Sequence, residues 1–505
     1  MPLLQVHGIT KRFGSLTAND RVTIDVEAGE VHAVLGENGA GKSTLMNIIY
    51  GLLHPDEGSM TLAGQPFQPR GPREAMAAGI GMVHQHFMLI PALTVVENIV
   101  LGREPGTRLR LDLDVAAREI RQLGGRYHME VDPYARVRDL PVGLQQRVEI
   151  LKAFYRKARL LILDEPTAML TPQETGELFA IIERLQGEGL SILFISHKLE
   201  EARRIAQRIT VMRLGRVVET LPAEGATAQE LANAMVGRDV VLQVERDPQP
   251  PGDPVLEVEN LTVLDATGKP RVKDLSLTVR AGEIVGIAGV DGNGQEELAA
   301  ALAGLLPAVH GRIRLAGRDV TGAPVRRRLE EGLGYIPADR QAEGLVMNFT
   351  LAENLALRSY WRAPYARGLM LAFERFNSVG RGQLERFDVR PADPRMLARQ
   401  LSGGNQQKVI LAREVGARPK MLIASQPTRG LDVGAIEFVQ RRLLELRSQG
   451  TGILLISLEL EEILALSDRI GVLYGGQLVA MLDGARVTRE RVGLLMAGSR
   501  EEVSA

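Results

Sequence analysis

The sequence predicts an α/β protein that consists of two tandem copies of one domain. Short apolar runs alternate with helical patterns, which indicates parallel sheets covered by helices on both faces. Segments of the first half also recur in the second half: Leu4–Thr10 returns as Leu256–Thr262, and the glycines of Gly36–Gly41 return in Gly289–Gly294. A repeat of this length is far too long for a solenoid, so each copy is expected to fold as a complete domain.

The boundary between the copies is expected at a proline-rich junction. Residues 244–254 contain four prolines and one glycine, a composition typical of an extended linker. We therefore predict a first domain over residues 1–243, a linker over 244–254 and a second domain over 255–505. Because the linker is short, the two copies are expected to stay close neighbours.

Three apolar runs in the first copy are typical of buried parallel strands. They occupy Val31–Leu35, Leu160–Leu163 and Ile192–Ile195. Helical patterns occupy Ser43–Leu53, which is expected to end near His54 and Pro55, and Gln173–Gln186. The stretch from Gln85 to Tyr155 contains no such strand, so we expect it to form a mostly helical lobe inserted into the sheet domain.

The composition excludes several classes of protein. The 505 residues include 61 Lys and Arg against 62 Asp and Glu, which gives a formal net charge of −1. This balance argues against a nucleic-acid partner, because such binding depends mainly on neutralising phosphates. The sequence has no cysteine, which excludes disulfides, thiolate zinc sites and iron–sulfur clusters. No apolar run reaches about 18 residues, so any membrane role is expected to be peripheral.

A phosphate-binding loop is predicted between the first apolar strand and the helix that follows it. Residues 36–44 match the pattern Gly-x4-Gly-Lys-Ser/Thr, in which backbone amides and the helix N-terminus face the phosphates. Lys42 is expected to neutralise the outer phosphates, and Ser43 to offer its hydroxyl to Mg²⁺. The alternative is an ordinary glycine-rich turn. The candidate ATP-binding residues of this loop are Gly36, Glu37, Asn38, Gly39, Ala40, Gly41, Lys42, Ser43 and Thr44.

Further candidates stand at the ends of predicted strands. Asp164 is expected to hold Mg²⁺ and Glu165 to polarise the attacking water, since phosphoryl transfer depends on positioning and electrostatics. Solvation of a strand end is the alternative for this pair. His197 is a candidate sensor of the γ-phosphate or a structural hydrogen-bonding group, and Gln85 a candidate link from the γ-phosphate to the helical lobe. Phe13 is a candidate for stacking on adenine, with burial in the core as the alternative.

Together these residues resemble the ATP-binding subunits of ABC transporters. The resemblance depends on Asp164-Glu165-Pro166 after four apolar residues, on Ile195-Ser196-His197, and on Leu401–Gln407, which matches the family's signature motif almost fully. It covers essentially the whole chain, twice. It implies two P-loop NTPase domains of the ABC type, each with a mainly parallel sheet core, a small antiparallel β part and an inserted helical lobe.

In that family two such domains face each other head to tail, and each ATP lies between the phosphate loop of one and the signature motif of the other. The resemblance therefore implies an internal pseudo-dimer, with ATP and Mg²⁺ as cofactors. It assigns ATP contacts in the second copy to Ser402, Gly403, Gly404, Asn405 and Asp432. It places Ser43, Gln85 and Asp164 at the metal, and it makes Glu165, His197 and Gln85 the catalytic residues.

The two copies depart from the family's pattern in complementary ways. The second copy has Gln295-Glu296 where a lysine and a Ser/Thr are expected, Ser425-Gln426 at the Asp-Glu position, and Leu458 at the histidine position. The first copy's signature segment, Leu140–Leu144, lacks the serine, and Thr171 stands where the second copy has Asp432. Head-to-tail pairing collects every intact group in one composite site, so we expect a single hydrolytic site. The other site either binds no nucleotide or binds it loosely without hydrolysis.

The tandem arrangement resembles the importers of simple sugars and nucleosides, and Gly289–Gln295 and Gln85–Leu89 look most like the nucleoside branch. The resemblance implies an ATPase that energises uptake of a nucleoside or simple sugar. It implies two membrane permease subunits and an extracytoplasmic solute-binding protein as partners, and a peripheral position on the cytoplasmic face of the cell membrane. The alternatives are a soluble tandem ATPase acting on ribosomes, a DNA-repair ATPase of the same superfamily, and a nucleotide-binding regulator without hydrolysis.

Overall fold

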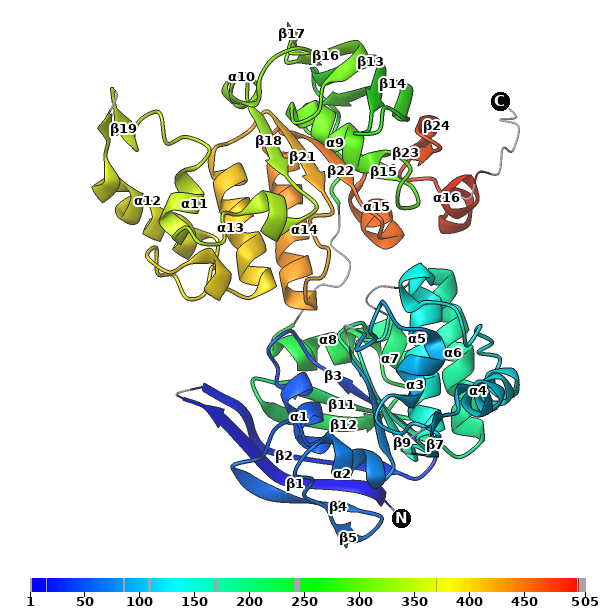
Figure 1. Cartoon of the computed structure of the whole chain (residues 1–505). Helices are drawn as coiled ribbons and strands as arrows, with labels where there is room; N and C mark the ends of the chain where they lie inside the picture. Colours follow the sequence, from blue (N-terminus) through cyan, green and yellow to red (C-terminus); the bar gives the residue numbers. More distant parts are fainter. Residues whose placement is uncertain are drawn as a thin grey trace. The chain divides into compact units, whose positions relative to one another are not determined.

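The chain folds into two compact units of the same kind, unit 1 (Met1–Val240) and unit 2 (Val241–Ala505) (Figure 1). The computed structural model describes residues 2–14, 16–84, 87–107, 110–167, 170, 172–239, 246–368, 370–496 and 498. Each unit combines a six-stranded, mostly parallel sheet with a four-stranded antiparallel sheet and several helices. The predicted fold class is confirmed.

Unit 1 is organised around a six-stranded sheet with the strand order β12-β11-β3-β10-β9-β6. The strands are β3 (Val31–Leu35), β6 (Ile80–Val83), β9 (Leu160–Asp164), β10 (Ser191–Ser196), β11 (Arg208–Arg213) and β12 (Arg216–Pro222). All neighbours in this sheet are parallel except β11 and β12. The antiparallel sheet consists of β1 (Pro2–Phe13), β2 (Leu16–Glu27), β4 (Glu57–Leu62) and β5 (Gln65–Pro66).

Alternate residues of the parallel strands pack into two separate cores. Leu160 and Ile162 face a core that they share with α1 (Lys42–Ile49) and the antiparallel sheet. Leu161 and Leu163 face a second core, which they share with helices α3 to α6, within residues 95–187. Successive side chains of a strand point to opposite faces, so a continuous apolar run is what a sheet covered on both faces requires. In Figure 1 the antiparallel strands lie on one side of this sheet and α4–α6 on the other.

The helices of unit 1 mostly follow the predicted pattern. They are α1 (Lys42–Ile49), α2 (Pro72–Ala77), α3 (Val95–Val100), α4 (Leu113–Tyr127), α5 (Val142–Tyr155), α6 (Pro172–Gly187), α7 (Leu199–Ile205), α8 (Ala228–Val236) and the 3₁₀ turn η1 (Val137–Asp139). One expectation was wrong. Helix α1 ends at Ile49 and not near His54, because Gly51 takes a φ of 79°, which is incompatible with a continuing helix. The lobe between Gln85 and Tyr155 is mostly helical where the structure describes it, as predicted, and it also contains a small hairpin, β7 (Gly106–Thr107) and β8 (Arg110–Leu111).

Unit 2 repeats this architecture. Its parallel sheet has the order β18-β21-β22-β15-β23-β24, and its antiparallel sheet the order β14-β13-β16-β17. The strands are β13 (Pro254–Leu264), β14 (Pro270–Arg280), β15 (Ile284–Ala288), β16 (Ala308–Leu315), β17 (Arg318–Asp319), β18 (Leu333–Ile336), β19 (Ala366–Arg367), β20 (Met370–Leu371), β21 (Met421–Ser425), β22 (Gly452–Ile456), β23 (Arg469–Tyr474) and β24 (Gln477–Asp483). The helices are α9 (Gln295–Ala303), α10 (Val325–Glu330), α11 (Leu351–Ala356), α12 (Phe373–Arg386), α13 (Gly403–Gly416), α14 (Val433–Ser448), α15 (Leu460–Leu466) and α16 (Arg489–Met496), with a π-helical turn η2 (Arg340–Gly344) and a 3₁₀ turn η3 (Ala398–Gln400).

The described part of the junction, from Arg246 onward, packs along unit 2. Arg447 donates a hydrogen bond to the carbonyl oxygen of Asp247 at 2.9 Å, and the amide of Gly252 donates to the Ala281 carbonyl at 2.8 Å. Across the described residues, no helix is both long enough and apolar enough to span a membrane.

Candidate active site

The predicted phosphate loop of unit 1 lies at the carboxyl end of β3, directly before α1. Gly39 and Gly41 have φ angles of 85° and 95°, a region that side chains rarely tolerate. A methyl group on Gly41 would come within 2.3 Å of the Ala18 carbonyl oxygen. The Asn19 side chain, which the sequence analysis did not single out, donates to the Gly41 carbonyl at 3.0 Å. The antiparallel sheet therefore fixes the shape of the loop.

Lys42 supplies the positive charge of this loop. It is the first residue of α1 and only 5% of its surface is exposed. Its ammonium group donates to the carbonyl oxygens of Gly36 and Glu37 at 2.6 and 3.0 Å. A cation held at a helix N-terminus beside the backbone amides of a glycine-containing loop is an arrangement that favours phosphate.

Asp164 ends β9 beside Ser43, and the two residues fit a divalent cation. Burial and the neighbouring Glu165 carboxylate raise the pKa of Asp164, whereas the Ser43 hydroxyl and the charge of Lys42 act in the opposite direction. The Oδ1 atom of Asp164 is buried and has no hydrogen-bond partner among the described residues. An unsatisfied carboxylate oxygen next to a hydroxyl group is a donor set that suits Mg²⁺.

Glu165 and His197 form a pair at the carboxyl ends of β9 and β10. These strands are parallel neighbours, so the residues that follow them meet at one edge of the sheet. His197 Nδ1 and Glu165 Oε1 are 3.0 Å apart. Burial acts to raise the pKa of Glu165, but the hydrogen bond with His197 and the charges of His197, Lys42 and Lys198 lower it overall. Glu165 is therefore ionised at neutral pH, as a group that polarises water must be.

Two further site residues were predicted from the sequence, Gln85 and Phe13. Gln85 lies outside the described residues. Phe13 ends β1 with 47% of its surface exposed, and the Lys11 ammonium lies 5.7 Å from its ring centre. The alternative that placed Phe13 in the core is therefore wrong, because the end of β1 extends past the packed part of the antiparallel sheet.

The corresponding loop of unit 2 has the same backbone but lacks the phosphate-binding groups. Gly294 has a φ of 104° before α9, as Gly41 does before α1. Gln295 replaces the lysine, is 5% exposed, and donates from its side-chain amide to the Val290 carbonyl at 3.0 Å. Burial and several nearby carboxylates, Asp291 first among them, raise the pKa of Glu296. Carboxylates gathered at this position repel phosphate.

The turn after the carboxylate strand also has the same shape in both units. Glu165 has a φ of 47° and Gln426 a φ of 48°. Their amides donate to the neighbouring strand, at 3.0 Å to the Ile195 carbonyl and 2.7 Å to the Ile456 carbonyl. In unit 2 the side chain of Gln426 accepts a long bond of 3.4 Å from the Leu458 amide. In unit 2, Gln426 and Leu458 thus stand at the positions of Glu165 and His197, and neither has an ionisable side chain.

The predicted signature residues lie at the start of α13. Ser402 is exposed, and its hydroxyl oxygen accepts a hydrogen bond from the Asn405 side chain at 3.0 Å. The side-chain oxygen of Asn405, Oδ1, in turn accepts from the Arg390 backbone amide at 2.8 Å. The first turn of α13 contains no acidic residue, and Ser402 does not cap it. The amide end of this helix therefore stays electropositive.

Asp432 lies beside these signature residues. Its carboxylate caps α14 by accepting from the Ala435 amide at 2.9 Å. Its Oδ2 atom is 3.6 Å from the place that a methyl group on Gly404 would take. The second-copy candidates thus lie together in unit 2, and Asp432 also has a local structural role. Its first-copy counterpart, Thr171, lies outside the described residues.

Two residues near the signature segments were missed by sequence reasoning. Arg340 lies against Gly403 in unit 2, and Glu174 lies against Gly143 in unit 1. Both are far from the glycines in sequence, and only the packing of the chain brings them there, so no sequence signal marks either residue.

Comparisons with known proteins give a consistent result. The family model described as ABC transporter matches the chain twice, at residues 19–168 and 272–429. The nucleoside import ATP-binding protein of Lactococcus lactis subsp. cremoris is 49% identical, with 98% of each chain covered. The guanosine import ATP-binding protein of Bacillus subtilis is 47% identical, with 99% of this chain and 98% of that protein covered. The glucose import ATP-binding protein of Haloferax volcanii is 45% identical, with 98% and 96% covered.

Proposed function

The chain belongs to the ABC transporter family, and we propose that it hydrolyses ATP at one composite site built from both units. It is an ATPase and the ATP-binding subunit of an importer for a nucleoside or a simple sugar. The relatives named for nucleoside and guanosine import are 49% and 47% identical to it, against 45% for the relative named for glucose import. This order supports a nucleoside as the transported molecule. Because all three relatives are named as import proteins, they do not favour the alternative of a ribosome-acting ATPase.

The observation that carries the composite site is the division of intact groups between the units. Unit 1 has the buried Lys42 and the Glu165–His197 pair but no serine in its signature segment. Unit 2 has Ser402 and its glycines but Gln295 in place of the lysine. Head-to-tail pairing of the units would unite every intact group in one site and every replaced group in the other.

Each group in this site has surroundings that suit its proposed role. Lys42 neutralises the outer phosphates, and the ionised Glu165 polarises the attacking water while His197 holds its carboxylate in place. Ser43 and Asp164 would hold Mg²⁺, which would neutralise charge that develops on the phosphate oxygens. Gln85 and Phe13 are the proposed contacts to the metal and to adenine.

Paired substitutions at the two signature segments test the composite site. Ser402→Arg should block ATP hydrolysis by the full chain, because the bulky side chain displaces the phosphate held by Lys42. Pro141→Arg is the matched change in unit 1; in the proposed head-to-tail pairing it would face the loop of Gln295, so it should leave most of the activity. Thermal unfolding first establishes that both variants fold. Equal loss in both, or the reverse pattern, would overturn the single-site assignment.

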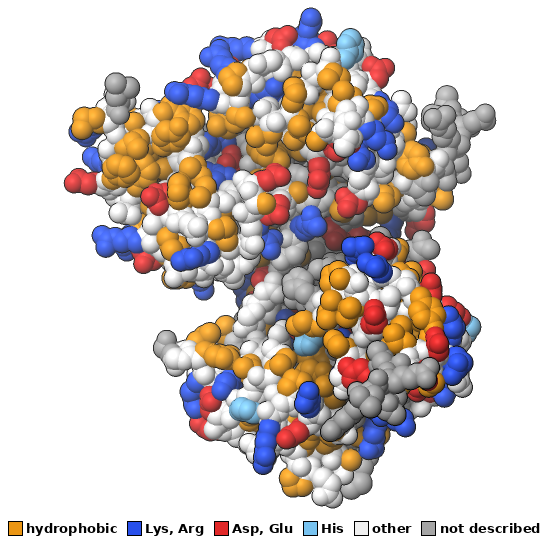
Figure 2. All heavy atoms as spheres, viewed as in Figure 1, with side chains coloured by type: hydrophobic (Ala, Val, Ile, Leu, Met, Phe, Trp, Pro, Cys, Tyr) orange, Lys and Arg blue, Asp and Glu red, His pale blue; other side chains and the backbone are white. Residues whose placement is uncertain are grey.

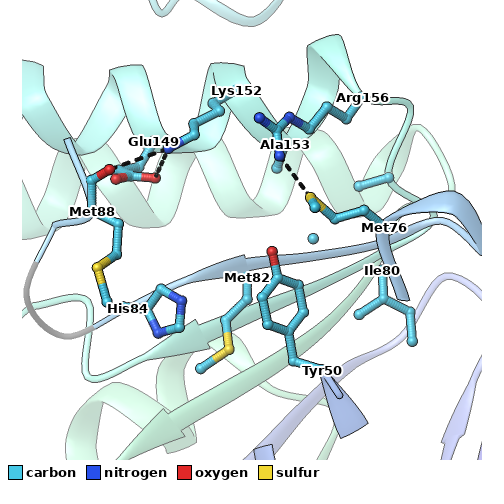
Figure 3. A pocket seen from close by; sticks show the side chains of 12 residues that line it. Tyr50, Met76, Ile80, Met82, His84, Met88, Glu149, Lys152, Ala153 and Arg156 are labelled. Carbon is cyan, nitrogen blue, oxygen red and sulfur yellow. Dashed lines mark hydrogen bonds and ion pairs between the residues drawn. The ribbon is translucent and has the colours of Figure 1, made fainter. Parts of the chain in front are cut away.

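We also propose that two membrane permease subunits bind the chain, one on each unit, at the cytoplasmic face of the cell membrane, and that an extracytoplasmic solute-binding protein completes the importer. A pocket in unit 1, next to His84, supports the binding of a permease subunit to that unit (Figure 3). The methionines that line it are Met76, Met82 and Met88. At its rim the Lys152 ammonium lies 3.7 Å from Glu149 and 3.3 Å from the Met88 carbonyl oxygen. Flexible thioether side chains adapt to a partner's surface, which suits a docking site.

Unit 2 has an exposed apolar surface on its own helical lobe, near β19, β20 and α12, where Figure 2 shows hydrophobic side chains gathered. The exposed residues are Tyr360, Met370, Leu371 and Phe373.

Met88 in unit 1 is 63% exposed, so Met88→Glu should leave folding and basal ATPase activity of the full chain unchanged. The same variant should lose co-purification with the permeases from membranes. Unchanged co-purification would place the docking surface of unit 1 elsewhere.

A further inference from the structure

Side chains of opposite charge lie over the signature glycines of the two units. In unit 2 the guanidinium group of Arg340 covers Gly403, where a methyl group would come within 2.8 Å of Arg340 Nη2. The same guanidinium donates from Nη1 to the Arg429 carbonyl oxygen at 2.7 Å. Arg340 therefore joins the start of α13 to the segment that leads to Asp432, and both segments contain predicted ATP contacts.

The charge of Arg340 is not neutralised by a hydrogen-bonded carboxylate among the described residues. Its Nε atom is buried and has no hydrogen-bond partner among these same residues. The adjacent Asp339 carboxylate accepts from the amides of Gln341 and Ala342 instead, and so caps η2. Burial and the neighbouring Arg429 lower the pKa of Arg340, with Asp339 acting in the opposite direction. A half-buried cation at the uncapped amide end of a 14-residue helix is less favourable without a bound anion than with one.

Unit 1 has the reverse arrangement. A methyl group on Gly143 would come within 2.6 Å of Glu174 Oε1, so a carboxylate covers the start of α5. The residues of unit 2 that correspond to Gly143 and Glu174, at an offset of 261, are Gly404 and Ala435. A methyl group on Gly404 would lie 3.3 Å from the Cβ atom of Ala435. The start of α5 thus meets a carboxylate at Gly143, whereas the start of α13 meets the Arg340 guanidinium at Gly403 and, farther away, the Asp432 carboxylate at Gly404.

We propose that Arg340 is a positioning residue for the γ-phosphate end of ATP. It holds the Ser402–Gly403 turn and the Arg429–Asp432 segment in one arrangement and adds positive charge where the terminal phosphate would be bound. Glu174 has the opposite effect and closes the unit 1 signature segment to phosphate. This inference rests on the proposed composite site, because it needs the signature segment of unit 2 to meet ATP held by Lys42.

The test compares ATP with ADP, which lacks the γ-phosphate. Dissociation constants are measured for the full-chain Glu165→Gln protein, in which turnover is expected to stop, with and without a second substitution. Arg340→Gln should weaken ATP binding about tenfold, or ~1.4 kcal/mol, and leave ADP binding unchanged. Arg340→Lys keeps the charge but cannot bridge both segments, so it should recover part of the loss. Equal losses for ATP and ADP, or no loss for ATP, would overturn the proposal.

Two further variants separate this proposal from the composite site itself. Glu174→Gln is the matched control in unit 1 and should leave the affinity of the Lys42 site for ATP unchanged. Ser402→Arg should weaken ATP binding if the composite site is correct. An effect of Ser402→Arg without an effect of Arg340→Gln rejects Arg340 alone. No effect of either variant rejects the composite site and the role of Arg340 with it.

Discussion

Replacement of Glu462 by glutamine should stabilise unit 2 at alkaline pH far more than at acid pH. Glu462 is 4% exposed, and neither of its carboxylate oxygens has a hydrogen-bond partner among the described residues. Burial raises the pKa of Glu462 to about 7; the hydroxyls of Ser457 and Thr428 act against this rise and the charge of Glu459 adds to it. Below pH 7 the folded unit therefore keeps a proton on Glu462 that the unfolded chain releases near its ordinary pKa of 4.5.

The magnitude follows from the linkage between protonation and folding. Because the pKa is raised in the folded state, the stability that Glu462 contributes is fully present below pH 4.5 and is lost as the pH rises through about 7. At about 1.4 kcal/mol per pKa unit, this interval corresponds to roughly 3 kcal/mol of unfolding free energy. Glutamine has no charge to bury. The stability of Glu462→Gln relative to the parent should therefore rise by roughly 2 to 3 kcal/mol between pH 5 and pH 8.

Trp361 makes the measurement specific to unit 2, because it is the single tryptophan of the chain. Urea unfolding of the full chain, followed by its fluorescence at both pH values, gives the two free energies. The matched control is Glu201→Gln in unit 1, where Glu201 accepts hydrogen bonds from Thr167 and Ser196. Followed by circular dichroism, that variant should lose stability at both pH values. An effect of Glu462→Gln that is equal at pH 5 and pH 8 would refute the reasoning.

Three further predictions concern the candidate site. Lys42→Ala should lower ATP turnover, measured as phosphate release, about 100-fold or more (~3 kcal/mol of barrier), and near-normal turnover would contradict its assignment. Glu165→Gln should keep ATP affinity but lose turnover, because glutamine preserves the shape and not the charge; loss of ATP binding would indicate a structural role instead. Gly41→Ala should abolish ATP binding, because its methyl group would lie 2.3 Å from the Ala18 carbonyl oxygen, whereas Gly64→Ala, also at positive φ but with open space around it, should bind ATP normally.

The fold could be predicted because its signals are local. The run Leu160–Leu163 is apolar at every position, which suits a strand covered on both faces, and the structure buries all four side chains. The pattern around Lys42 requires a strand before it and a helix after it, and the chain supplies both. Since strands β3, β9 and β10 run parallel, their carboxyl ends place Lys42, Glu165 and His197 at one edge of the sheet.

Other features depend on contacts between distant segments and could not be predicted. Arg340 and Glu174 reach the signature glycines only through the packing of each unit. Glu462 also lacks the ion pair that its counterpart makes, since unit 2 has Glu459 where unit 1 has Lys198 3.2 Å from Glu201. The sequence displays that exchange, but only the burial of Glu462 gives it an energetic consequence. The exposure of Phe13 likewise depends on how far β1 and β2 extend beyond β4, whose pairing with β1 ends at Thr10.

The matching φ angles of Glu165 and Gln426, 47° and 48°, show that unit 2 keeps the backbone of the proposed catalytic turn without its carboxylate. Strained backbone is often taken as a mark of catalysis, since active sites are where such strain tends to collect. Here the same strain occurs where a neutral amide stands in place of the carboxylate, so it belongs to the junction between strand and loop and is independent of the reaction. A survey that located active centres by backbone strain would therefore include position 426 together with Glu165, and with other residues at positive φ such as Leu214 and Arg418. For protein engineering, unit 2 is a ready scaffold, in which a carboxylate introduced at position 426 would meet a backbone already in the required conformation.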